Sequence, residues 1–189
     1  MELCSREGLS ELCQELLAIG AITYDRRQKQ LERAALNPHD NSLVNSRLVN
    51  TIAELMYERT VEHHLEYDAV TSIPNGGNVY AEGLLRVIAE RDGRQLPMIR
   101  LQKGTDYPER ILDHAALQPG SRVLIVDDVL RYGANAVETL RILAGAQYRA
   151  GVALFVADFE WSGSECLSKQ HACSVLSLIN SSLMRSLYS

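Results

Sequence analysis

The stretch RVLIVDDVLRYGANAVETLRIL, residues Arg122 to Leu143, decides the fold. Val123 to Val126 is a short and continuous apolar run, which is typical of a strand buried on both faces of a parallel sheet. Two aspartates, Asp127 and Asp128, follow the run directly, and Leu130 to Asn135 then turns tightly into an amphipathic helix. The stretch therefore predicts a strand, a turn and a helix, with two carboxylates at the carboxyl end of the strand.

Outward from this stretch, short apolar runs alternate with segments of helical periodicity. Strands are predicted over residues 67–74, 96–102, 122–129, 150–159 and 172–179, and helices over residues 10–19, 46–62, 78–91 and 135–146. Residues 24–45 are polar and fit either a helix fragment or a hairpin that leads into a loop. The alternation indicates an α/β fold, a mostly parallel sheet with helices on both faces.

Length and composition narrow the function classes. A chain of 189 residues with 46% hydrophobic and 23% charged residues is expected to form one globular domain. The net charge of -5 argues against general nucleic-acid binding, and no apolar run reaches the ~18 residues of a membrane span. Cys4, Cys13, Cys166 and Cys173 match neither zinc-ligand spacing nor a C-x-x-C motif, so we expect reduced, mostly buried thiols in a cytoplasmic protein.

The two acids are predicted to lie where parallel α/β sheets collect their ligands, at the carboxyl ends of the strands. Carboxylates suit the hydroxyls of a sugar or the waters around Mg²⁺, because both donate hydrogen bonds. The turn after them opens a helix, whose free amides and dipole suit a phosphate. The alternative is an acidic pair that merely ends a strand, with Asn135 as the helix N-cap.

The segment LIVDDVLRYGANA resembles the signature of the type I phosphoribosyltransferases, in which a strand ends in two acids and continues into a phosphate loop. YDAVTSIPNGGNVYAEGL and FVADFEWSGSECL resemble their counterparts in the orotate phosphoribosyltransferase branch, and they occur in the same order. The resemblance covers most of residues 10 to 180. It implies a type I phosphoribosyltransferase-like domain over residues 1–189, with a small N-terminal helical hood region to about residue 45 and a core over about 46–180, assembled as a homodimer.

The resemblance also implies ligands and residue roles. Such a protein transfers a 5-phosphoribosyl group from 5-phosphoribosyl 1-diphosphate, abbreviated PRPP, to a nitrogenous base, with Mg²⁺ bound together with the PRPP and no metal held by the protein directly. The segment IRLQKGTDYPER matches a mobile loop that brings cations over the pyrophosphate, partly from the neighbouring subunit. The implied residues are Asp127 and Asp128 for the ribose hydroxyls, Arg131, Tyr132, Gly133, Ala134 and Asn135 for the 5′-phosphate, Asn75, Gly76 and Gly77 for the pyrophosphate, and Arg100 and Lys103, then Arg110, as loop cations.

The phosphate loop departs from the family pattern. The pattern has hydroxyl side chains at Arg131, Tyr132 and Asn135 and a second glycine at Ala134, so that Gly133 is the position left unchanged. A cradle of backbone amides survives such changes, and Arg131 could pair with a phosphate itself. Its bulk could equally occupy the pocket. The sequence therefore leaves two alternatives open, a rebuilt anion site and a plugged one.

The residues that would contact the acceptor base depart further from the family pattern. The orotate branch has an Asp-Arg pair whose arginine contacts the orotate carboxylate, whereas Asp158 here precedes Phe159. An apolar or purine-like base that stacks on Phe159 or Trp161 could take the place of orotate. In the mobile loop, Leu101 stands where the family pattern has a lysine. Two functions are thus predicted: a phosphoribosyltransferase, favoured by the intact acids, or a non-catalytic regulator that binds a nucleotide or PRPP. The first is our leading hypothesis.

Overall fold

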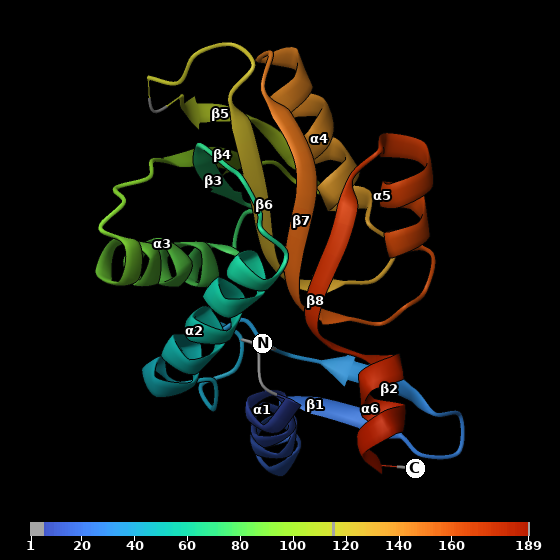
Figure 1. Ribbon diagram of the computed structural model, residues 1–189. Helices are drawn as coiled ribbons and strands as arrows, with labels where there is room; N and C mark the ends of the chain where they lie inside the picture. The colour runs from blue at the N-terminus through green and yellow to red at the C-terminus, as the bar shows by residue number, and fades with distance from the viewer. Residues whose placement is uncertain (1–5, 115, 189) are drawn as a thin grey trace.

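The computed structural model describes residues 6–114 and 116–188 and is built on a six-stranded sheet of order β5-β4-β3-β6-β7-β8 (Figure 1). Neighbouring strands are parallel except β4 and β5, which pair antiparallel. The strands are β3 (Ala69–Ser72), β4 (Met98–Lys103), β5 (Pro108–Asp113), β6 (Arg122–Leu130), β7 (Arg149–Asp158) and β8 (Ser174–Asn180). The predicted α/β class with a mostly parallel sheet is confirmed.

Helices cover both faces of this sheet. Side chains of β6 alternate, so that Leu124 and Val126 join one core with helices α2 and α3, while Val123 and Ile125 join a second core with α4 and α5. Burial on both faces explains why β6 reads as a continuous apolar run. The helices are α1 (Arg6–Ala18), α2 (Ser46–Glu62), α3 (Asn78–Asp92), α4 (Ala134–Gly145), α5 (Gly163–His171) and α6 (Ser181–Tyr188).

Local signals fix several helix ends. The Asn45 side chain accepts a hydrogen bond from the backbone N–H of Leu48 at 3.0 Å, which caps α2. Gly93 ends α3 in the left-handed conformation with φ of 68°, a conformation that costs glycine little. These caps explain why the predicted bounds of α2 and α3 agree with the structure to within one residue.

The polar segment near the N-terminus forms a hairpin, as one of the two alternatives predicted. Strands β1 (Ile22–Asp25) and β2 (Gln30–Ala34) pair antiparallel and pack with α1 and α6 (Figure 1). The hydroxyl of Ser181, at the start of α6, accepts from the Leu31 N–H at 3.0 Å and donates to the Phe159 carbonyl at 3.1 Å. One buried hydroxyl therefore joins the hairpin to the loop that follows β7.

Three elements were not predicted, namely β5, α5 and α6. The β5 segment lies within the predicted loop, and four of its six residues are exposed, which leaves it little apolar signal. Helix α5 buries only Gly163 and Leu167. Cys13 and Cys173 are buried free thiols, as predicted, and Cys166 is partly buried, whereas Cys4 lies outside the described residues. No helix within the described ranges has the length and apolar character needed to cross a bilayer.

Candidate functional site

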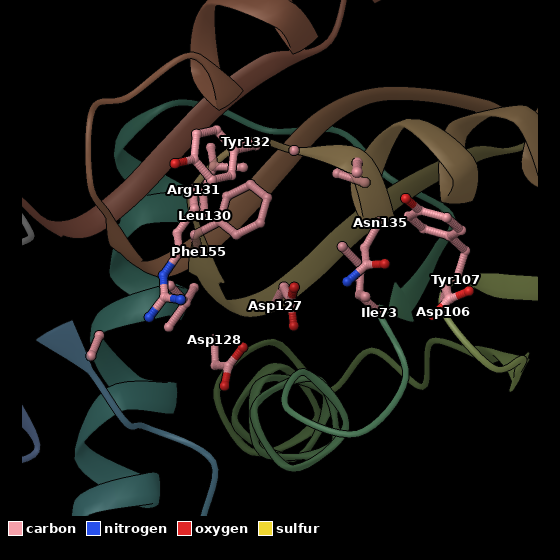
Figure 2. A pocket seen from close by; sticks show the side chains of 15 residues that line it. Ile73, Asp106, Tyr107, Asp127, Asp128, Leu130, Arg131, Tyr132, Asn135 and Phe155 are labelled. Carbon is pink, nitrogen blue, oxygen red and sulfur yellow. The ribbon is translucent and has the colours of Figure 1, made fainter.

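A cavity of about 540 Å³ opens at the carboxyl end of β6 (Figure 2). Its wall combines Asp127 and Asp128 of β6, the turn from Leu130 into α4, and the turn between β4 and β5. Figure 2 shows the two aspartates in the middle, with Arg131 on one side and Asn135 and Asp106 on the other. Residues from separate parts of the chain thus meet at the sheet edge where the sequence places the site.

The two acids form one hydrogen-bonded unit. Burial raises the pKa of the Asp127 carboxyl well above its ordinary value, and the neighbouring charge of Asp128 raises it further. Burial also raises the pKa of Asp128, although the hydrogen bond from Asp127 opposes that rise. The raised pKa favours the protonated form of Asp127, in which the carboxyl can donate a hydrogen bond to Asp128. The pair can both donate to and accept from ligand hydroxyls.

The glycine turn after β3 packs against this pair. A Cβ atom on Gly76 would overlap the Asp128 carboxylate, and one on Gly77 would lie 2.6 Å from the Val126 carbonyl oxygen. Only residues without side chains allow the turn to approach β6 so closely. Asn75 precedes them, exposed and with φ of 81°, in a conformation that asparagine tolerates better than most residues. The backbone of the turn therefore stands directly beside the acids.

The turn between β6 and α4 leaves the start of α4 uncapped. Gly133 is the N-cap residue with φ of 83°, and no side chain bonds to the first amides of the helix. Asn135 lies inside α4 and lines the cavity instead of capping the helix. Since the first amides of a helix lack partners within it, they remain donors for an anion.

Helix α5 supports the same turn from behind. The Gly163 N–H donates to the Arg131 carbonyl at 2.9 Å, and a Cβ atom on Gly133 would lie 3.3 Å from the Gly163 Cα. A Cβ atom on Gly163 would lie 2.5 Å from that carbonyl oxygen. The turn is thus held by close backbone contact, which fixes its shape independently of its own side chains.

The two large side chains of the turn, Arg131 and Tyr132, contact aromatic residues of the loop after β7. The Arg131 guanidinium lies over the Phe159 ring, 4.9 Å from its centroid, and the Tyr132 ring lies 5.1 Å from that of Trp161. Tyr132 is 66% exposed, so it does not fill the turn. Between the two alternatives left by the sequence, this geometry favours a rebuilt anion site over a plugged one.

The predicted loop cations lie away from this cavity. Arg100 pairs with Glu82 at 3.1 Å on the surface, and Lys103 is exposed at the end of β4. Arg110 donates to the Gln102 side chain at 2.7 Å on the same hairpin. Leu101, where the family pattern has a lysine, is buried in the core. Arg100, Lys103 and Arg110 therefore do not line the cavity of their own chain.

Two polar lining residues were missed by the sequence reasoning. Asp106 and Tyr107 lie at the tip of the β4–β5 hairpin and reach the cavity (Figure 2). The position of these two residues depends on how β5 pairs with β4. The apolar pattern of β5 is too weak for the strand to be predicted from the sequence. They add a third carboxyl, so that in the described part of the chain Arg131 is the one cationic side chain lining a cavity with three aspartates.

The loop after β7 is held in place by Asp158. Its carboxylate accepts from the Glu160 N–H at 2.8 Å and from the Ser164 hydroxyl at 2.9 Å. Burial raises the pKa of Asp158, and these two hydrogen bonds oppose the rise. The fixed loop buries Phe159 and leaves Trp161 38% exposed.

No family model matches the chain. Uridine 5′-monophosphate synthase of Bos taurus is 26% identical over 121 residues, which make up 64% of this chain and 24% of the bovine protein. The match thus spans about a quarter of the length of that curated relative.

Solved structures extend the likeness over nearly the whole chain. Orotate phosphoribosyltransferase of Aeropyrum pernix aligns with a TM-score of 0.66 and 18% identity, covering 93% of this chain and 97% of its own. The Mycobacterium tuberculosis enzyme in complex with PRPP aligns with a TM-score of 0.64 and 18% identity, covering 92% and 89%. At such identities the likeness concerns the fold.

Proposed function

We propose that this chain, which has the type I phosphoribosyltransferase fold implied by its motifs, transfers a 5-phosphoribosyl group from PRPP to a nitrogenous base. The observation that carries the proposal is the meeting of three features at the carboxyl end of β6: an acid pair and an uncapped helix start that line the cavity, and a glycine turn that packs against Asp128 beside it. Each suits one part of PRPP. We further propose that the protein acts in the cytoplasm as one domain, with its hood and core divided as predicted.

The assignment of parts follows from their chemistry. Asp127 and Asp128 would bind the ribose hydroxyls, because the pair both donates and accepts hydrogen bonds. The amides at the start of α4, with Asn135, would hold the 5′-phosphate. The backbone of Asn75, Gly76 and Gly77 would face the pyrophosphate. With phosphates held at both ends, the anomeric carbon would lie above the acids, whose negative charge stabilises a cationic sugar in the transition state.

Magnesium fits the charge balance of this cavity. Three aspartates and one arginine line it, so a bare polyanion would meet net repulsion. Bound with PRPP, Mg²⁺ would neutralise charge that develops on the departing pyrophosphate. Asp127 and Asp128 would contact water molecules bound to the Mg²⁺ and would not coordinate the ion directly.

Binding of PRPP with Mg²⁺ is expected to stabilise the wild-type protein. At a ligand concentration of about 100 times Kd, the gain is ~2.7 kcal/mol, or roughly 5–10 °C in Tm. In Asp128→Asn most of this shift should disappear, because the sugar hydroxyls lose their charged acceptor. Thermal unfolding with and without ligand measures the shift, and Glu11→Gln, an equivalent acid-to-amide change on the exposed face of α1, is the matched control.

A second measurement separates the enzyme from the non-catalytic alternative. Pyrophosphate release would be followed with a panel of bases. If ligand stabilises the wild type but no base releases pyrophosphate, a PRPP-binding regulator is the better description. If no shift occurs in either protein, the proposed binding site is wrong.

The exposed cations of the β4–β5 hairpin are proposed to act across a homodimer. Neither Arg100 nor Lys103 lines the cavity of its own chain; Lys103 is exposed, and Arg100 pairs at the surface with Glu82. Mixing inactive Lys103→Ala with inactive Asp128→Asn should then restore activity, because a mixed dimer holds one intact cavity facing one intact hairpin. Random exchange predicts about one quarter of wild-type activity.

The control for this mixing uses two cavity variants. Asp127→Asn and Asp128→Asn damage the cavity of both subunits in any mixed dimer, so no activity should return. Failure of the first mixture to regain activity after subunit exchange would place Lys103 in its own subunit's reaction or outside the reaction altogether.

A further inference from the structure

A second pocket, of about 190 Å³, lies at the amino ends of β6 and β7. Arg122 is the first residue of β6 and Arg149 the first of β7, and both are exposed residues that line it. In Figure 1 this end of the sheet faces away from the β1–β2 hairpin and α6. Among the residues that the structure describes, none lines both this pocket and the cavity of the acid pair. We call it the amino-end pocket.

The walls of the amino-end pocket are mainly apolar. Its lining includes Leu65, Tyr67, Leu124 and Val152, all of which pack in the core that α2 and α3 share with β6. A cavity of about 150 Å³ with apolar walls is large enough to hold benzene. The amino-end pocket therefore has room for one six-membered hydrocarbon ring with a small group attached to it.

Strand β7 is irregular where it borders the pocket. Arg149 of β7 pairs in register with Arg122 of β6. The next pair, Val152 with Leu124, lies three residues further along β7 and two further along β6, so β7 bulges by one residue. Gly151 lies in the bulge, is exposed, and lines the pocket, and a Cβ atom on it would meet nothing within 4 Å. A glycine in a bulge allows another molecule to approach the backbone closely.

The two arginines beside the pocket have different surroundings. Because they pair in register on neighbouring strands, their like charges repel each other. Arg122 is neutralised, since its guanidinium binds the Glu66 carboxylate and, at 3.1 Å, the Asp68 carboxylate. Within residues 6–114 and 116–188, no carboxylate lies within ion-pair distance of Arg149. Arg149 thus places an uncompensated positive charge beside an apolar space.

We infer that the amino-end pocket binds a small monocarboxylic acid with an apolar ring, and that Arg149 holds its carboxylate. The planar edge of a guanidinium offers a carboxylate two parallel hydrogen bonds. The Glu66 carboxylate, which also lines the pocket, is bound to Arg122 and leaves Arg149 to the ligand. One negative charge matches the one uncompensated cation, whereas a phosphate ester would bring nearly two.

This inference is independent of the proposed function, because the amino-end pocket and the acid pair lie at opposite ends of β6. The occupant would therefore bind together with PRPP and would not compete with it. The site would serve a second ligand of the protein, chemically distinct from the sugar diphosphate.

Three probes test the charge and the ring separately. They are cyclohexanecarboxylate, its neutral amide cyclohexanecarboxamide, and acetate, and each is titrated into the full-length protein labelled with ¹⁵N. The backbone amide signals of Gly151 and Val152 report the amino-end pocket. The variants are Arg149→Met and Arg149→Lys, and Arg27→Met, on the exposed β1–β2 turn, is the control for loss of one cation. The spectrum of each variant also shows that it is folded.

The wild type is expected to bind cyclohexanecarboxylate with a Kd on the order of 1 mM, which suits a ligand of so few atoms. Its amide and acetate should each bind about tenfold more weakly, because one lacks the charge and the other the ring. In Arg149→Met the acid should exceed the amide in affinity by about twofold or less, with the Kd of the amide nearly unchanged. Arg149→Lys should be intermediate, and Arg27→Met should behave as the wild type.

Four results would overturn the inference. Equal affinity of the wild type for the acid and the amide would remove Arg149 from the site, and equal affinity for acetate would remove the apolar walls. Unchanged Gly151 and Val152 signals with every probe would show that the pocket takes no such ligand. Displacement of cyclohexanecarboxylate by PRPP with Mg²⁺ would place the probe in the cavity of the acid pair. Binding that persists beside PRPP supports a separate site, and the thermal shift with PRPP tests the proposed function on its own.

Discussion

Gly76→Ala is expected to weaken PRPP binding by about a hundredfold while the protein stays folded. The added Cβ would overlap the Asp128 carboxylate, closer than real Cβ atoms approach their neighbours. That carboxylate is the end of a side chain, so it can rotate away at a small cost in folding free energy. A displacement of about 1 Å at a binding group is enough for a loss of this size.

Two other glycines make this prediction specific. In Gly77→Ala the new Cβ would meet the Val126 and Ile73 carbonyl oxygens, which belong to the backbone, so we expect lost stability as well as lost binding. In Gly145→Ala, at the last residue of α4, the new Cβ meets nothing within 4 Å, and we expect stability and binding to stay close to those of the wild type. Calorimetric titration with PRPP and Mg²⁺, together with Tm, separates the three cases. Unchanged affinity in Gly76→Ala would show that the Asp128 carboxylate does not grip the sugar where we place it.

Asp127→Asn should make the protein more stable at neutral pH and nearly inactive. Burial raises the pKa of Asp127 well above its ordinary value, so the folded protein retains a proton that the unfolded chain releases above about pH 4. The stability that the protonated carboxyl contributes is complete below that pH. It is lost progressively as the pH rises toward the raised pKa of the folded state. Asparagine keeps the hydrogen-bonding shape and does not titrate.

The gain from Asp127→Asn should therefore increase with pH. We expect little difference near pH 4 and a gain of about 1 kcal/mol or more at pH 7.5, equivalent to at least 2–4 °C in Tm. Urea unfolding across this range measures the difference. Turnover should fall by roughly a hundredfold or more, because the amide can neither release nor accept the proton that the acid pair shares. A variant less stable than the wild type at pH 7.5 would contradict the buried, protonated state of Asp127.

Much of the fold follows from the sequence because burial on both faces leaves a strong pattern. The run from Val123 to Val126 predicts β6, and the caps Asn45 and Gly93 set the ends of α2 and α3. Strand β5 escapes prediction because it is an edge strand exposed along most of its length. Its place depends on pairing with β4, which no local pattern records.

Part of the candidate site could likewise be predicted from the sequence, and part of it could not. Asp127, Asp128 and the glycine turn could be located from sequence because the acids directly follow the apolar run of β6 and the glycine turn follows the buried strand β3. The contribution of Asp106 and Tyr107 depends on an unpredicted hairpin register. The pairing of Arg131 with Phe159 joins two loops that are separate in sequence, and only the packing of β7 beside β6 brings them together.

The buried hydroxyl of Ser181 ties the hairpin to the loop that carries Phe159. Any opening movement of the hairpin away from that loop must break at least one of these two bonds. Ala34 of β2 lines the cavity, so these two bonds also hold part of its wall in place. Truncation of the chain before Ser181 would remove both bonds, and we expect it to increase the rate at which a bound ligand dissociates.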